Sequence, residues 1–266
     1  MNYENHKSQI TNHKSQIANK LRLRTGQGFT LIELSIVIVI IGLIVAGVVG
    51  GQALVEQAKL RSQISQLNKF EVAYHAFKLE YDAIPGDFNR ASQYWGVLGG
   101  NGNRQLVTNM DQELGVNSES FLFFYHLTLA ELVQEEFNNT NLLGSGYPEL
   151  EISKGKGMTA GARQNGWLAG YQVSNDYNFK AGLNLQVGQP SESTRNWRND
   201  SVGTSSPKNY YTIDKKIDDG IAMEGRFRSY RPPNSLFGNC LDGDNGDYLL
   251  SNDQPSCHAY YIIEGL

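Results

Sequence analysis

The chain has 266 residues, with 23 basic and 27 acidic side chains, so its formal net charge is −4. Residues 1–28 hold five of the basic residues and one of the acidic residues, so 18 basic and 26 acidic residues remain, a charge of −8. This balance argues against a general nucleic-acid-binding protein, because phosphate groups require a broad basic surface. It leaves room for a small local basic patch.

The first predicted element is a membrane span that follows a basic segment. The basic residues of this segment are Lys7, Lys14, Lys20, Arg22 and Arg24. From Leu31 to Val49 the chain is almost wholly apolar, and a run of about 20 such residues crosses a bilayer as a helix. Because loops rich in Lys and Arg stay in the cytoplasm, we expect a single span with a cytoplasmic N terminus and an exported C-terminal domain.

Four glycines lie in or just after this span: Gly42, Gly47, Gly50 and Gly51. Gly47 and Gly51 have the four-residue spacing that lets two helices approach closely in lipid. Glycine also weakens a helix by about 1 kcal/mol relative to alanine. The pair Gly50–Gly51 is therefore a position where the helix either melts locally or stays intact.

Glu33 is the one ionisable residue of the span. A carboxylate in the hydrocarbon core costs several kcal/mol, so it usually has a partner or a function. One interpretation is that Glu33 lies close enough to the interface to reach water. The other is that cleavage after Gly28 frees an amino group on Phe29, which pairs with Glu33 of a neighbouring copy and sets the axial register.

The stretch from Gly26 to Leu34, Gly-Gln-Gly-Phe-Thr-Leu-Ile-Glu-Leu, resembles the processing site of type IV prepilins and of type II secretion pseudopilins. The resemblance covers about residues 21–81. It implies cleavage by prepilin peptidase between Gly28 and Phe29, N-methylation of Phe29, and an assembly role for Glu33. It also implies residence in the lipid bilayer of the bacterial inner membrane, followed by assembly with other pilin or pseudopilin subunits on an inner-membrane platform.

These observations predict three parts of the chain. Residues 1–28 form a leader that is removed, residues 29–83 form a long helix with its transmembrane half at about 30–50, and residues 84–266 form an exported, periplasmic domain. The second half of the helix has an apolar stripe with helical spacing. The stripe consists of Leu60, Ile64, Leu67, Phe70, Tyr74, Phe77 and Tyr81. Pro85–Gly86 ends the helix.

In the exported domain we expect one more helix and a few strands. An apolar stripe from Phe121 to Val133 predicts a helix over 118–136, on which His126 is a packed or surface residue. Short apolar runs bounded by Gly and Asn predict strands at 168–173, 181–187 and 259–263. The predicted fold is therefore α+β, with a long N-terminal helix packed on a small antiparallel sheet with long loops.

Cys240 and Cys257 are the two cysteines of the chain, and both fall on the exported side. In an oxidising compartment such a pair is more often a disulfide than a metal site. Two reduced, buried thiols are the alternative. Type IV pilins commonly close a C-terminal loop in this way, so the resemblance also implies the disulfide.

Asp242, Asp244 and Asp247 alternate with Gly and Asn inside the loop between the cysteines. Such carboxylates can supply oxygen ligands to calcium, and the resemblance to pseudopilins also points to calcium as a possible cofactor. A second acidic turn over 213–220 could serve in the same way. The alternative for both segments is a solvated turn.

The sequence contains no recognisable catalytic motif, such as H-E-x-x-H, G-x-S-x-G or a phosphate-binding glycine loop with its lysine. We therefore expect a structural protein and not an enzyme. The leading hypothesis is a subunit of a type IV pilus or a type II secretion pseudopilus. The alternative is a minor pilin-like module, anchored in the membrane, that binds a ligand in the periplasm or caps a fibre.

Overall fold

A computed structural model describes residues 28–104, 106, 119–140, 144–153, 156–163, 167–168, 171–172, 182–190, 203–230, 239–243 and 247–265. The predicted leader therefore lies outside the described residues, apart from Gly28. The chain divides into two compact units, Met1–Ala53 and Leu54–Leu266.

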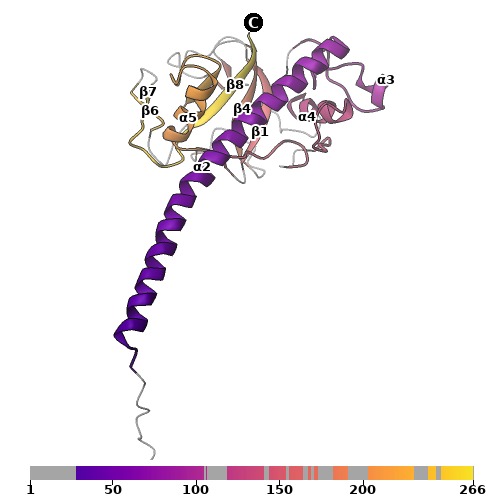
Figure 1. The fold of residues 1–266 in the computed structure, drawn as a ribbon. Helices are drawn as coiled ribbons and strands as arrows, with labels where there is room; N and C mark the ends of the chain where they lie inside the picture. The colour runs from indigo at the N-terminus through magenta and orange to yellow at the C-terminus, as the bar shows by residue number, and fades with distance from the viewer. Residues whose placement is uncertain are drawn as a thin grey trace, which may run out of the picture. The chain divides into compact units, whose positions relative to one another are not determined.

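Helix α2 (Leu31–Tyr81) is the longest element, with 51 residues. The other helices are α3 (Ala91–Trp95), α4 (Glu119–Leu129) and α5 (Pro207–Ile217). The strands are β1 (Lys156–Arg163), β2 (Trp167–Leu168), β3 (Tyr171–Gln172), β4 (Gly182–Pro190), β5 (Phe227–Tyr230), β6 (Leu241–Asp242), β7 (Asp247–Tyr248) and β8 (His258–Gly265). This long helix and the antiparallel sheet (Figure 1) confirm the predicted α+β fold.

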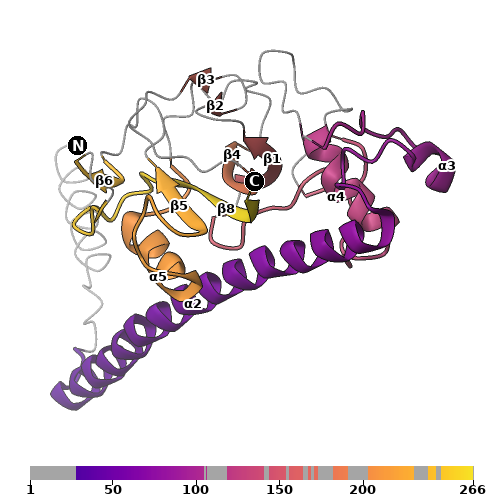
Figure 2. The ribbon, with the colours of Figure 1, turned by 90° about the horizontal axis from the view of Figure 1, so that it is seen from above.

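The second half of α2 buries the predicted apolar stripe. Leu60, Leu67, Phe70, Tyr74 and Phe77 are at most 1 % exposed, while the remaining two members of the stripe are partly buried. The ring of Phe70 packs edge-on against Phe124 of α4, with 5.1 Å between the ring centroids. Figure 2 shows this half of the helix running along one side of the domain, past α5 and α4. The stripe is thus a core face, as predicted.

The helix ends at Tyr81, and the Pro85–Gly86 turn that follows is held by His126. Gly86 has φ +89°, and a Cβ there would lie 2.2 Å from the backbone oxygen of Glu119, so only glycine fits. The backbone N–H of Gly86 donates to Nδ1 of His126 (2.9 Å), and Nε2 of His126 lies 3.2 Å from the oxygen of Leu98. His126 is therefore a packed residue with two backbone partners, in its neutral form with the proton on Nε2.

Helix α4 is shorter than predicted. It ends at Leu129, because Glu131 adopts φ +57° and the chain turns back on itself. The N–H of Leu132 bonds to the oxygen of Leu127, and the N–H of Glu131 to that of Thr128. This pair of bonds is the Schellman motif that closes helix C-termini. The prediction of a helix to residue 136 is wrong, because the apolar spacing continues through the cap.

The main sheet has four antiparallel strands in the order β1-β4-β8-β5. The predicted strands at 181–187 and 259–263 correspond to β4 and β8. Leu185, Tyr261 and Phe227 lie opposite one another on the face that joins the core. The prediction of one strand at 168–173 is wrong, since β2 and β3, which overlap that segment, pair with each other as a separate two-stranded sheet.

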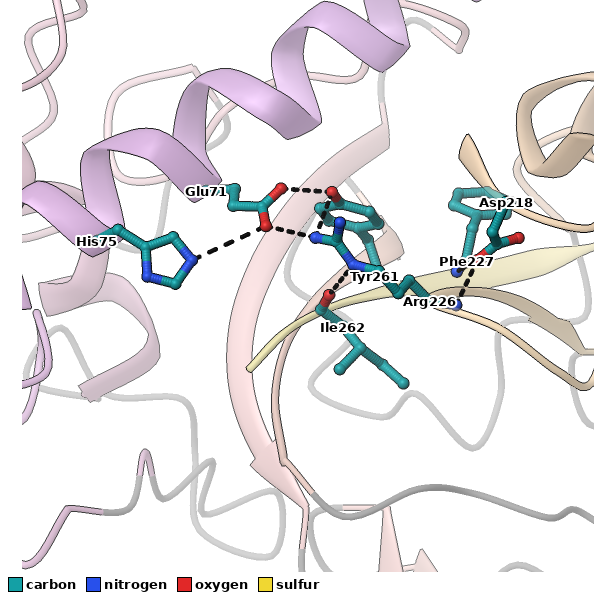
Figure 3. Close-up of polar contacts among 7 residues, drawn as sticks. All are labelled: Glu71, His75, Asp218, Arg226, Phe227, Tyr261 and Ile262. Atoms are coloured by element: carbon teal, nitrogen blue, oxygen red, sulfur yellow. Dashed lines mark hydrogen bonds and ion pairs between the residues drawn. The ribbon is translucent and has the colours of Figure 1, made fainter. Parts of the chain in front are cut away.

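A polar cluster joins α2 to the sheet (Figure 3). Tyr261 on β8 donates to one carboxylate oxygen of Glu71, and Arg226 forms an ion pair with the other. Arg226 also donates to the hydroxyl of Tyr261 (2.7 Å) and, through Nε, to the oxygen of Ile262 (3.3 Å). The backbone N–H of Arg226 donates to Asp218. One arginine thus connects the helix, the strand β8 and the turn before β5.

Candidate processing and assembly site

The start of α2 is fixed by a reciprocal cap between Thr30 and Glu33. The backbone N–H and the hydroxyl of Thr30 both donate to Oε2 of Glu33, each at 2.8 Å. In return, the N–H of Glu33 donates to the Thr30 hydroxyl (3.2 Å). This is a capping box, in which Thr30 and Glu33 satisfy N–H groups that the helix itself leaves unpaired.

Thr30 was not among the residues predicted for this site. The signal was present, because Thr-x-x-Glu before an apolar run is the sequence form of a capping box. Both bonds from Thr30 end on Oε2. The second oxygen, Oε1, makes no hydrogen bond to the described part of the chain.

The first half of α2 exposes its apolar side chains. From Phe29 to Val49, every large apolar residue is between 49 % and 89 % exposed, with Phe29 the most exposed. Among the described residues, this helix is long and apolar enough by composition to cross a membrane. A surface of this kind needs either lipid or other protein against it.

The glycines of the span are open on every side. A Cβ placed on Gly42, Gly47, Gly50 or Gly51 would meet no atom within 4 Å beyond the helix's own backbone. Helix α2 continues without interruption through Gly50–Gly51. Of the two alternatives for this pair, the structure therefore has the intact helix.

The family described as "Prokaryotic N-terminal methylation motif" matches residues 23–49. The chain carries the N-terminal signature of type IV pilins and pseudopilins. Comparisons with curated proteins and with solved structures give no match. The pilin signature therefore covers the residues just before α2 and the first part of α2, a stretch that includes Gly28, Phe29 and Glu33.

The predicted cleavage point between Gly28 and Phe29 lies in an exposed segment. Gly28 precedes the helix, and a Cβ on it would meet no atom within 4 Å. The capping box uses only atoms of Thr30 and Glu33. Loss of everything before Phe29 would therefore leave the start of the helix intact.

Cys240 and Cys257 form the predicted disulfide, with 4.9 Å between their Cα atoms. Both residues are fully buried. The backbone around Cys257 is also tied to the segment before α5, since its oxygen accepts from the N–H of Thr204 (2.7 Å) and its N–H donates to Ser205 (3.1 Å). The disulfide thus joins the residue just before β8 to the residue just before β6.

The two acidic segments proposed as calcium ligands differ in geometry. Asp242 and Asp247 are exposed and lie opposite each other in the β6–β7 hairpin, while Asp244 lies outside the described residues. In the second segment, the carboxylates of Asp214, Asp218 and Asp219 lie within 4.8 Å of one another. This segment is not a simple turn as predicted, because α5 continues to Ile217.

Hydrogen bonds within the chain account for the second acidic cluster. Asp214 accepts from the hydroxyl of Tyr248 (2.7 Å) and from the N–H of Gly220 (3.2 Å). Burial raises the pKa of the Asp214 carboxyl to about 8, and a hydrogen bond to Asp218 contributes. At neutral pH Asp214 is therefore largely protonated, and a cation would have to displace that proton.

Proposed function

We propose that this chain is a structural, non-enzymatic subunit of a type IV pilus or of a type II secretion pseudopilus. In this proposal prepilin peptidase cleaves between Gly28 and Phe29, and the mature chain polymerises through the first half of α2. The observation that carries the proposal is the exposed apolar helix directly after the processing signature. Such a surface suits the bilayer before assembly and the neighbouring subunits afterwards.

The proposed topology follows from charge. The basic leader stays in the cytoplasm, the first half of α2 crosses the inner membrane once, and the domain from residue 84 onward lies in the periplasm. An assembly platform in the inner membrane would then draw the subunit out of the bilayer into the fibre. Cys240 and Cys257 agree with this placement, since disulfides persist in the periplasm.

In the fibre, Glu33 would pair with the amino group of Phe29 on a neighbouring copy. Two features of the structure support this role. Oε1 of Glu33 makes no hydrogen bond to the described part of its own chain, and the capping box holds the carboxylate at the first turn of the helix. A copy in the wrong register would leave both charges in an apolar environment without a partner, which is costly.

The abundance of the chain in sheared surface fibres tests the proposal. Fibres are collected from wild-type cells and from cells that lack prepilin peptidase, and the chain is quantified against the total fibre protein. We expect it to dominate the wild-type fraction and to be absent without the peptidase. A trace amount in fibres built from another subunit would favour the minor, fibre-capping role instead. Equal amounts in both strains would overturn the proposed cleavage by prepilin peptidase.

A further inference from the structure

The second half of α2 has an exposed side that its own domain does not cover. Val72 is 68 % exposed and Leu79 is 90 % exposed, although the opposite side of the same helix supplies fully buried core residues such as Tyr74 and Phe77. Large apolar side chains with this exposure on a helix that is otherwise packed indicate a surface for a partner.

The exposed side changes in size along the helix. Ala58, Ser65, Val72 and Leu79 are all exposed and follow one another at intervals of seven residues, so they lie on one side of α2. The side chains on this side are small at Ala58 and Ser65 and large at Val72 and Leu79. A projecting end and a recessed end of this kind fit each other when one copy is shifted along another.

Charges flank the two ends with opposite sign. Lys59 and Arg61 flank Ala58, whereas Glu80 and Asp82 flank Leu79, and all four are exposed. Lys78 also lies near Leu79, and Arg90 donates to the backbone oxygen of Tyr81 (2.7 Å), so the negative charge of this end lies on the two flanks that Glu80 and Asp82 form. Lys59 and Glu80 are 21 positions apart, and so are Arg61 and Asp82.

We propose that the Leu79 end of α2 in one copy packs against the Ala58 end of α2 in a second copy, parallel to it and displaced by 21 residues. This inference rests on the proposed function and adds the register of a contact in the fibre. At about 1.5 Å per residue, the displacement is about 31 Å. Glu80 then lies beside Arg61, and Asp82, the first residue after the end of α2, lies on the side of Lys59.

The charge pattern favours this displacement over a contact between two copies of α2 that are not displaced along their axes. Without displacement, Lys59 and Arg61 would face the same residues of the other copy, and like charges across an interface cost several kcal/mol. Two copies that span one bilayer cannot shift by about 31 Å, because the hydrocarbon core is only about 30 Å thick. The contact therefore forms when one copy has left the membrane, so it belongs to the fibre.

Charge reversal in the full-length chain tests the contact. Lys59→Glu with Arg61→Glu should reduce the fibre yield by about tenfold or more. A tenfold reduction corresponds to a loss of about 1.4 kcal/mol in the free energy of each contact between copies. Glu80→Lys with Asp82→Lys should do the same, and all four changes together should restore the yield. Lys208→Glu with Lys216→Glu, two exposed positions on α5, is the matched control and should assemble normally.

A cysteine pair tests the register directly. Ala58→Cys with Leu79→Cys in one chain should give a ladder of cross-linked copies when fibres are oxidised, while Ala58→Cys alone should give none. Leader cleavage and membrane levels are measured for every variant. Two outcomes would overturn this inference and leave the proposed function standing, provided that the wild type forms fibres. In the first, the charge-reversed variants assemble normally; in the second, the fourfold change does not restore the yield. If the wild type forms no fibres, the proposed function fails instead.

Discussion

Tyr261 on β8 donates a hydrogen bond to Glu71 on α2, with 2.5 Å between the two oxygens (Figure 3). The two residues are 190 positions apart in the sequence. Arg226 completes the cluster by pairing with the same carboxylate and with the Tyr261 hydroxyl. This cluster links the core-facing half of the long helix to the last strand of the sheet.

Removal of the Tyr261 hydroxyl should weaken this link. Tyr261→Phe keeps the ring in the core but leaves Glu71 with one partner fewer, so we expect a loss of about 1 to 2 kcal/mol in the free energy of unfolding. Denaturant unfolding of the full chain in detergent measures it. Tyr211→Phe is the control, because within the described residues the Tyr211 hydroxyl has only an exposed contact with Lys215, and its effect should stay within about 0.5 kcal/mol. Equal losses in the two variants would contradict the account.

The capping box separates two roles of Glu33. Glu33→Gln keeps an oxygen for the cap but removes the charge, so the helix should form and the leader should be cleaved, while fibres become sparse. Thr30→Ala weakens the cap by about 1 kcal/mol but keeps the charge, so fibres should persist. Counting fibres by electron microscopy distinguishes the two. Normal fibres from Glu33→Gln would show that the charge has no role in assembly.

His126 should make the domain less stable in acid. Burial lowers the pKa of its imidazole to about 4, against an unfolded value of about 6.5. Between these values the unfolded state binds the proton and the folded state does not, so stability should fall as the pH drops from about 6.5 to about 4. The total loss is about 3 kcal/mol.

Unfolding curves between pH 4 and pH 7 test this dependence, with His126→Gln as the comparison. The glutamine can still accept the hydrogen bond from Gly86 but does not titrate, so the difference in stability between wild type and variant should shrink toward acid pH. A difference that stays constant over this range would mean that His126 does not titrate on unfolding.

The disulfide gives a separate test of compartment and stability. Thiol labelling of the native protein should modify neither Cys240 nor Cys257 until a reductant is added. Replacing both by Ala should lower the free energy of unfolding by about 3 kcal/mol, because the cross-link restricts the unfolded chain. Immediate labelling without reductant would show that the loop is held by packing alone.

The sequence was most informative where one local pattern decides the structure. The stripe of α2 and the strands β4 and β8 were predicted because apolar spacing directly reflects which side is buried. The C-terminal end of α4 was not predicted correctly, because it depends on the left-handed backbone of Glu131 and not on apolar spacing. Strand β1 was missed because its sequence, Lys-Gly-Met-Thr-Ala-Gly-Ala-Arg, is rich in Gly and Ala and shows no alternation.

Two omissions had a signal in the sequence. Helix α5 begins with Ser206 as its N-cap and Pro207 in its first turn, a typical helix start that was not recognised. Thr30 likewise stands three residues before Glu33. By contrast, two of the partners of Glu71, Arg226 and Tyr261, lie 155 and 190 residues away, and no local pattern indicates such a pairing.

Mass spectrometry of the chain in sheared surface fibres and in membranes tests the central claim most directly. If the chain is a processed subunit that assembles through α2, the form in fibres begins at Phe29 with a methylated amino group. The form in membranes of cells that lack prepilin peptidase retains Met1–Gly28. Detection of the chain only in membranes of wild-type cells, with the leader still attached, would contradict the account.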